Sequence, residues 1–407
     1  MATIATDRPI ASFDPSDTAL YTEDRWQEPF ARMRAETPLA WHPDSQFGPY
    51  WSASTHALIQ QVEALPDLFS SHRSITIVDS REDIQFDNFI AMDRPQHTQQ
   101  RRVVQPSFNP SEMKRREGEI RERVAALFDA LPPLGQVFDW VEEVSIPLTI
   151  GMICVLFDFP WEEWRDLKRW SDWASEVTPD QSEERTAKWQ EQMMQMLMRF
   201  DRLLEEKRAL PPTDDLMSRI IHSEAMGDMP PAERMGNIAL LIVGGNDTTR
   251  NSMSGLIDAF HRFPDQLDML HADPSLVPNA AAEIVRWQSP VTHMRRTASE
   301  DTELDGHLIR KGEKVVMWYL SANRDEAVFE DADRFDVTRE NARRHIGFGF
   351  GIHRCVGARL AELQLQIYIE ELLKRNVRIE KAGDWERAPS CFLHGFTHMP
   401  VRMVRRG

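Results

Sequence analysis

The sequence predicts several long helices joined by turn-rich segments that hold short strands. Apolar residues recur at helical spacing in several stretches, the longest over about residues 232–263. Aromatic and β-prone positions mixed with turn residues over 41–62 predict short strands followed by a helix. No linker-like separator, repeat or low-complexity tract interrupts the 407 residues, so one compact unit spanning residues 1–407 is expected.

Composition excludes some classes of function. A formal net charge of −17 disfavours nucleic acid and anionic membranes as partners. Cys154, Cys355 and Cys391 are too few and too scattered for a disulfide framework, which favours a reducing compartment. The first residues, MATIATDRPIASFDPSD, contain no long apolar run and no basic region, so a cytoplasmic protein without a membrane anchor is expected.

Two helices of the first half have recognisable ends. Asn109, Pro110 and Glu112 predict a helix start, with Asn as the cap, Pro in the first position and Glu closing a capping box. A second helical run carries methionines, among them Met193, and should end before Pro211. Methionines at helical spacing are more often core than pocket, although their adaptability also suits an oily ligand.

The pattern over 232–263 contains GGNDTTRN, which is poor in helix formers. Gly244 and Gly245 remove side chains where a ligand could approach, and Thr248 can bond its own backbone and open the helix locally. Such a conflict between local preference and the surrounding helix tends to mark a functional position. Near the C-terminus, CFLHGFTHMPVRM predicts a hairpin with its tip around 393–396.

Cys355 lies in RHIGFGFGIHRCVGARL, residues 344–360. Gly349 and Gly351 allow a tight turn before it, and a helical apolar pattern follows over 356–369. A cysteine at a helix N-terminus favours the thiolate, which suits a metal that needs a strong anionic ligand, such as haem iron. The absence of nearby cysteines argues against zinc, a disulfide or an iron-sulfur cluster, while a lone cysteine is more often a buried structural residue.

The string FGFGIHRCVG resembles the haem-binding loop of the cytochrome P450 superfamily. By that resemblance Cys355 is the proximal ligand of haem b (Fe-protoporphyrin IX), and Phe348, Gly349 and Gly357 belong to the same cofactor-binding loop. The fold implied is mainly α with small β-sheets. The haem would lie between the long helix of 232–263 and the helix that follows Cys355.

Other motifs match the superfamily in order. GGNDTTRN resembles its oxygen-binding helix, which implies that Gly244 lies at the haem and that Asp247 and Thr248 are the catalytic acid and alcohol that pass protons to bound O2. Read alone, this stretch is a kinked structural helix. The resemblance also implies donors to the haem propionates, which would be His97, Arg101, Arg296 and His353.

A structural pair is implied by AAEIVRW. Glu283 and Arg286 match the ExxR pattern, whose partner in the superfamily is an arginine from a later loop, and Arg334 in ADRFD is the candidate. Ala332 stands where the family often has proline. Without the resemblance, an ordinary surface ion pair would be the common explanation.

Within the superfamily, GGNDTTRNSM, THMRRTA and HGFTHMP resemble the bacterial alkane and fatty-acid terminal hydroxylases. The implied reaction inserts one oxygen atom from O2 into a terminal C–H bond of a hydrophobic substrate. Val291, Thr292, His293 and Met294 would border the pocket, with His293 equally well explained as a satisfied histidine near a strand. The expected pocket walls are Ile77, Val78, Phe86, Phe89, Leu240, Val243, Met294 and Phe396.

Electrons should come from NAD(P)H through a ferredoxin and a ferredoxin reductase, since no reductase domain is visible. Arg343, Arg344, Arg354 and Arg359 could form a positive docking patch, or could balance local acids. A hydroxylase of a terpene or another bulky hydrocarbon is the main alternative. A peroxygenase, an isomerase and a non-catalytic haem sensor also remain open.

Overall fold

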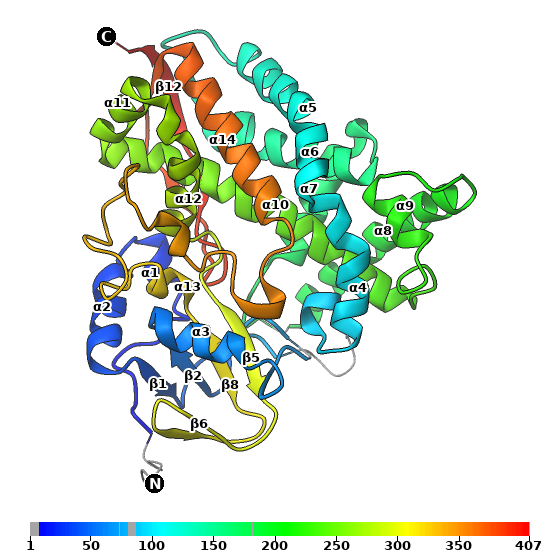
Figure 1. The fold of residues 1–407 in the computed structure, drawn as a ribbon, viewed down its shortest axis with the longest axis vertical. Coiled ribbons are helices and arrows are strands. Elements are labelled where there is room, and N and C mark those ends of the chain that lie inside the picture. Colours follow the sequence, from blue (N-terminus) through cyan, green and yellow to red (C-terminus); the bar gives the residue numbers. More distant parts are fainter. Residues whose placement is uncertain (1–7, 73, 80–86, 181, 407) are drawn as a thin grey trace.

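The computed structural model describes residues 8–72, 74–79, 87–180 and 182–406 (Figure 1). The predicted fold class, mainly helical with small sheets, is confirmed. The helices of the described residues are α1 Ala19–Thr22, α2 Gln27–Glu36, α3 His56–Ala64, α4 Gln96–Val104, α5 Pro110–Asp129, α6 Ile146–Phe157, α7 Trp164–Ala174, α8 Glu183–Arg208, α9 Leu216–Ile221, α10 Pro231–Arg262, α11 Pro264–Ala272, α12 Val277–Gln288, α13 Tyr319–Ala322 and α14 Ala358–Arg375.

The strands are short. They are β1 Leu39–His42, β2 Tyr50–Ala53, β3 Phe69–Ser70, β4 Val137–Asp139, β5 Met294–Ala298, β6 Thr302–Leu304, β7 His307–Ile309, β8 Lys314–Met317, β9 Val377–Lys381, β10 Glu386–Arg387, β11 Phe396–His398 and β12 Pro400–Arg405. Short 3-10 turns lie at η1 Phe89–Ala91, η2 Gln105–Phe108, η4 Trp161–Glu163, η5 Pro274–Leu276, η6 Ala342–Arg344 and η7 Gly351–His353, and one π-helical turn lies at η3 Val141–Ser145.

The largest sheet has the strand order β1-β2-β8-β5-β3. Its β2 and β8 strands run parallel, with Trp51 opposite Val315, and its other pairs are antiparallel. Figure 1 shows this sheet gathered beside α3 at one end of the molecule, away from most of the helices. The predicted strands and helix of residues 41–62 are therefore confirmed, because β1, β2 and α3 follow in that order.

Helix α10 is the centre of the helical part. It packs against α6, α7, α8, α11, α12 and α14, and most of its residues after Asn246 are buried. An apolar pattern of this length needs such neighbours on several sides, which explains why it is hydrophobic around much of its circumference. The helix is continuous from Pro231 to Arg262, so the expected local opening at Thr248 does not interrupt it.

Two local predictions differ from the structure. Helix α5 begins at Pro110 after Asn109, but neither half of the predicted capping box forms. The Glu112 carboxylate instead accepts from Arg115 at 2.5 Å and from Arg116 at 2.6 Å, because both guanidinium groups lie one turn further along the helix.

The predicted C-terminal hairpin forms with other boundaries than expected. Strand β11 pairs antiparallel with β10, so the turn covers residues 388–395 and includes part of the predicted tip, whereas β12 pairs with β4 and β9. Adjacent strands therefore enter different sheets, because β12 finds partners on both of its edges elsewhere in the chain.

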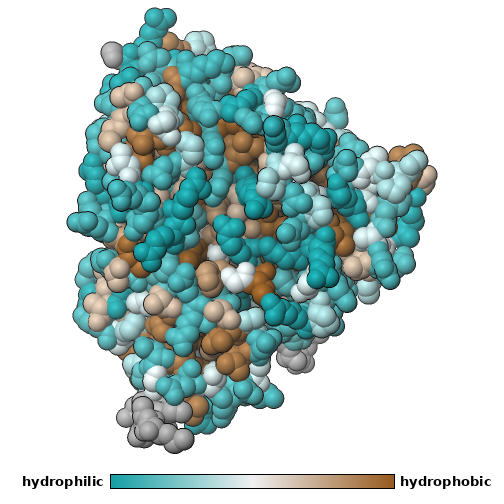
Figure 2. All heavy atoms as spheres, in the orientation of Figure 1, coloured by the Kyte–Doolittle hydropathy of each residue, from teal (hydrophilic) through white to brown (hydrophobic). Residues whose placement is uncertain are grey.

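The surface is polar on the face that carries α14. Figure 2 shows hydrophilic side chains over most of this face, with apolar groups visible mainly in the furrows between them. None of the helices in the described part of the chain combines the length and apolarity needed to cross a bilayer.

Candidate active site

A cavity of about 540 Å³ lies between α10, the loop before α14 and the 291–296 segment. Its walls are mostly apolar and include side chains from α8, α10, α14 and the 392–393 segment. Cys355 lines this cavity. Part of the Cys355 surface is accessible, but that part faces the cavity and not the bulk solvent. Protein atoms therefore surround the thiol.

The loop before Cys355 folds tightly, as the glycines predict. Gly349 and Gly351 have φ values of +68° and +67°, a region that favours glycine. The backbone N–H of Cys355 donates to the carbonyl of Phe348 at 2.8 Å and closes the turn. Helix α14 then begins at Ala358 with Gly357 as its cap, so Cys355 sits just ahead of a helix N-terminus.

Two opposing effects act on the Cys355 thiol. Burial raises its pKa, while hydrogen bonds from the backbone N–H groups of Gly357 and Ala358 and the charges of Arg101 and Arg354 lower it. The donors expected from the helix N-terminus are present and suit an anionic sulfur. The effect of burial on the thiol pKa is larger than the effect of these donors.

Helix α10 presents Gly244 and Thr248 to the cavity. A Cβ built on Gly244 would meet no atom within 4 Å, so the missing side chain leaves open space, whereas Gly245 lies against Ile153 of α6. The Thr248 hydroxyl donates to the Gly244 carbonyl at 3.0 Å, as predicted. One glycine of the pair therefore opens the cavity, and the other allows two helices to approach.

Asp247 points to the opposite side. Its carboxylate is fully buried and accepts from Ser171 of α7 at 3.0 Å and from Asn246 at 3.0 Å, and it forms an ion pair with Arg250 at 2.7 Å. Burial raises the pKa of Asp247, and the charge of Arg250 opposes that rise. Asp247 does not line the cavity among the described residues, so the two predicted catalytic groups are neighbours in sequence that face different ways.

The four predicted propionate donors lie together at one side of the cavity. Arg101, Arg296 and His353 line it, and the ring of His97 packs on that of His353 with 4.2 Å between centroids. Burial and the neighbouring arginines lower the pKa of His97 to about 4 and that of His353 to about 2. Both nitrogens of each ring are buried without a hydrogen-bond partner within the described residues.

These residues fit a haem. Unpartnered buried nitrogens beside two guanidinium groups are what a pair of anionic carboxylates requires. The apolar walls and the open space at Gly244 suit a flat macrocycle, and a single sulfur with backbone donors suits one axial ligand.

The predicted pocket walls divide into two groups. Val78, Phe89, Leu240, Val243 and Met294 line the cavity. Ile77 and Phe396 do not: Ile77 packs in a core with Trp318 and Phe392, and Phe396 packs against Trp385. Phe86 lies outside the described residues.

Only two of the four residues 291–294, all expected to border the pocket, line the cavity. Val291 and Met294 line the cavity, while Thr292 and His293 are buried behind it. His293 accepts from the Ile77 N–H at 3.3 Å and lies 3.0 Å from the carbonyl of Cys391, so it is a satisfied core histidine. Burial lowers its pKa to about 3.

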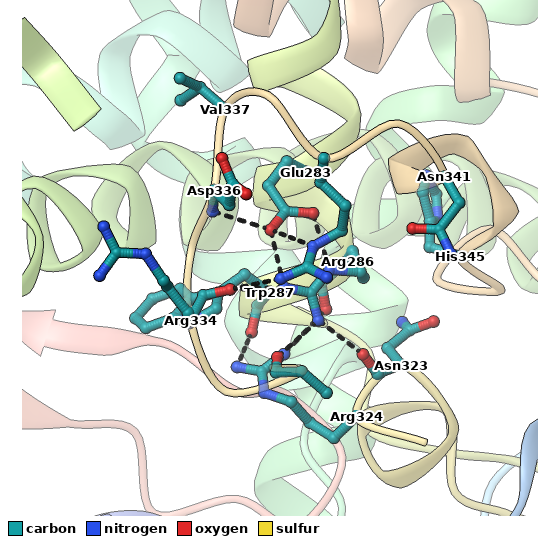
Figure 3. Close-up of polar contacts among 12 residues, drawn as sticks. Glu283, Arg286, Trp287, Asn323, Arg324, Arg334, Asp336, Val337, Asn341 and His345 are labelled. Carbon is teal, nitrogen blue, oxygen red and sulfur yellow. Dashed lines mark hydrogen bonds and ion pairs between the residues drawn. The ribbon is translucent and has the colours of Figure 1, made fainter. Parts of the chain in front are cut away.

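The structural pair is present, but its expected partner is wrong. Arg286 makes two bonds of 2.7 Å with Glu283, and both side chains are fully buried. The third member is Arg339, whose Nε lies 3.0 Å from Glu283 Oε1. Figure 3 shows the Arg334 guanidinium turned away from Glu283, while the Arg334 backbone carbonyl accepts from Arg286. The Arg334 guanidinium pairs with Asp265.

Sequence reasoning missed several residues that border the cavity. Phe392 lies at the wall beside Leu393, the end of the predicted 393–396 tip that does line the cavity, and a buried acid, Glu63 of α3, lies beside Arg296. A carboxylate in the apolar helix pattern HALIQQVEA was the available signal for Glu63. The signal for Arg339 was a second arginine on the same loop as Arg334.

A mainly helical fold that encloses an apolar cavity, with one cysteine on its wall and two arginines and two histidines at one side, is typical of haem-thiolate proteins. The family model that describes the cytochromes P450 matches residues 135–382. The chain belongs to the cytochrome P450 family.

Solved and curated proteins agree with this. The structure of cytochrome P450-153 from Novosphingobium aromaticivorans is 51% identical, with a TM-score of 0.92 over 96% of this chain and 99% of that one. Linalool 8-monooxygenase from Pseudomonas putida is 40% identical over 96% of this chain and 98% of its own length. A methyl-branched lipid omega-hydroxylase from Mycobacterium tuberculosis is 32% identical over 91% and 90%. This chain is a bacterial cytochrome P450 monooxygenase.

Proposed function

We propose that this monooxygenase hydroxylates the terminal carbon of medium-chain alkanes or fatty acids. The observation that carries the proposal is the apolar wall of the cavity that Cys355 also lines, to which Val78, Phe89, Leu240, Val243 and Met294 contribute. A primary C–H bond is stronger than its secondary neighbours, so attack at a chain end depends on positioning and not on reactivity. The omega-hydroxylase among the relatives supports attack at a chain end.

We assign the proximal ligand to Cys355 and the carboxylate contacts to His97, Arg101, Arg296 and His353. When bound, thiolate-ligated haem supplies the O2 chemistry that inserts one oxygen atom into a C–H bond. Phe348, Gly349 and Gly357 shape the loop at the sulfur, and Gly244 leaves room on the other side of the cavity.

Thr248 is assigned the proton-donating position, because α10 presents its hydroxyl to the cavity. We assign to Asp247 the role of passing protons from the solvent toward Thr248. Its partner Arg250 also lies 3.5 Å from Asp172, a partly exposed carboxylate on α7, so a chain of charged groups connects the buried acid with the surface.

Thr248→Ala is therefore expected to keep haem and substrate binding while most of the electrons supplied are lost as hydrogen peroxide. The removed hydroxyl is not needed for packing, since it bonds to the backbone of its own helix. A positioned proton donor typically contributes about 100-fold or more to the rate of its step, so product formed per NAD(P)H consumed should fall strongly. Thr248→Ser, which keeps the hydroxyl, is the matched control. Unchanged coupling in the alanine variant would remove Thr248 from this role.

The substrate proposal is tested by adding octane, lauric acid and a bulky terpene separately and following the haem spin-state spectrum. Products are then identified after turnover with a surrogate ferredoxin and its reductase. Terminal alcohols from the linear substrates would support the proposal, and mainly subterminal alcohols would contradict it.

Hydroxylation of a terpene is the second candidate. The 40% identity with a linalool 8-monooxygenase favours it, because that relative covers nearly the whole chain. A larger spin-state change and faster turnover with the terpene than with either linear substrate would decide for this candidate.

We also propose that electrons arrive from a ferredoxin at the surface near Cys355. Arg343, Arg344, Arg354 and Arg359 are all exposed there, and Arg343 lies 3.7 Å from Glu362. The polar character of the face that carries α14 is compatible with a transient, charge-guided contact (Figure 2).

A further inference from the structure

Glu63 is a buried acid that the proposed chemistry does not use. It lies near the end of α3, its side chain is 1% exposed, and it lines the same cavity as Cys355. A carboxylate is costly to bury unless several donors satisfy it, so its presence at this place needs a reason.

Three elements supply donors to this carboxylate. Its Oε2 accepts from the backbone N–H of Phe350 at 2.8 Å, and its Oε1 accepts from the Tyr319 hydroxyl at 2.6 Å. The Arg296 guanidinium lies 3.3 Å from Oε1. Burial raises the pKa of Glu63, while Arg296, Tyr319 and the Phe350 N–H act in the opposite direction.

The loop that carries Cys355 is seated directly on Glu63. A Cβ on Gly351 would lie 2.4 Å from the Glu63 backbone oxygen, and a Cβ on Gly349 would lie 3.4 Å from Oε1. The two glycines therefore serve the close approach to Glu63 as well as the turn. One carboxylate oxygen of Glu63 therefore contacts Phe350 of the cysteine loop, and the other contacts the Arg296 guanidinium in the cavity wall.

We propose that Glu63 is a positioning residue that sets the haem reduction potential. It fixes the loop through Phe350, and it neutralises part of the charge that Arg296 presents to the cavity. Removing the negative charge while keeping the shape makes the cavity more positive, which favours the reduced iron and raises its potential. The inference uses only the proposed binding of haem and is independent of the substrate.

The test compares haem-loaded variants of the full chain by spectroelectrochemistry. Glu63→Gln is expected to raise the midpoint potential by about 59 mV, the value of a tenfold change in a one-electron equilibrium. Glu63→Asp keeps the charge, and Tyr319→Phe removes one donor but leaves the charge, so both should stay much closer to the wild type. Asp258→Asn is the matched control, because Asp258 is a buried carboxylate of α10 paired with Arg262 and Arg387, away from this cavity.

A Gln variant that binds haem normally and has the potential of the wild type would overturn the proposal, as would an equal shift in Asp258→Asn. If Glu63→Gln fails to retain haem, Glu63→Asp decides, because it keeps the negative charge beside Arg296. Glu63→Asp should then retain haem with a potential close to that of the wild type. A rise of about 59 mV in Glu63→Asp, the size expected from loss of the charge, would contradict the proposed role of that charge.

Discussion

Replacing Cys355 with serine is expected to abolish the red-shifted Soret band of the ferrous carbonyl complex and to lower hydroxylation by more than a hundredfold. Replacing only the outer partners of a metal ligand commonly costs about 10- to 100-fold, so loss of the ligand itself should cost more. A serine hydroxyl is a much weaker anion than a thiolate. The measurement is the difference spectrum after reduction and addition of carbon monoxide, followed by a turnover assay.

The chain offers matched controls for this prediction. Cys154 and Cys391 are buried free thiols outside the cavity, and burial raises the pKa of each to about 12. Cys154→Ser and Cys391→Ser should keep the red-shifted band, even where they lower stability. Survival of that band in Cys355→Ser would show that another side chain ligates the iron, and the assignment of the site would fail.

The second large effect concerns stability. Glu283→Gln is expected to lower the free energy of unfolding by about 3–5 kcal/mol, because it leaves two buried guanidinium groups without their counter-charge. Arg286 is fully buried and Arg339 nearly so, and each bonds to the same carboxylate. Arg286 also donates to the carbonyl of Asn323 (Figure 3) and to that of Ala332, so the segments that carry these two carbonyls should lose stability as well. Chemical denaturation followed by circular dichroism measures it.

A variant of Arg334 is the control that shows which arginine, Arg334 or Arg339, stabilises the Glu283–Arg286 pair. Its side chain reaches an exposed aspartate, Asp265, at 2.5 Å, and such surface pairs contribute about 0–1 kcal/mol. Arg334→Ala should therefore stay within about 1 kcal/mol of the wild type, whereas Arg339→Ala should approach the effect of Glu283→Gln. The opposite order would restore the original expectation from the sequence.

Local patterns carried much of the candidate site. The cysteine loop could be predicted because two glycines with positive φ, a cysteine and a helix start are contiguous, and such geometry depends on neighbours along the chain. The length of α10 and the hydrogen bond of Thr248 followed from helical periodicity in the same way. Resemblance to a family then supplied the cofactor, which no periodicity could have named.

The direction in which each side chain points was harder to predict from the sequence. Asp247 and Thr248 are adjacent, yet successive residues of a helix point about 100° apart, and only the packing of α7 against α10 decides which one meets the cavity. Ile77 and Val78 lie in a run of bends, and His293 directly precedes β5, so only packing decides that Val78 and Met294 line the cavity while Ile77 and His293 do not.

The sequence by itself determined the family, the fold class and the turn before Cys355, because each depends on short, ordered motifs. Tertiary structure alone decided that Arg339 and not Arg334 completes the buried ion cluster, that β12 leaves β11 for other strands, and that Glu63 lies under the cysteine loop. Each of these contacts joins segments far apart in the chain. Their selection depends on which buried charges and backbone groups find partners once the segments pack, a competition that no single stretch of residues encodes.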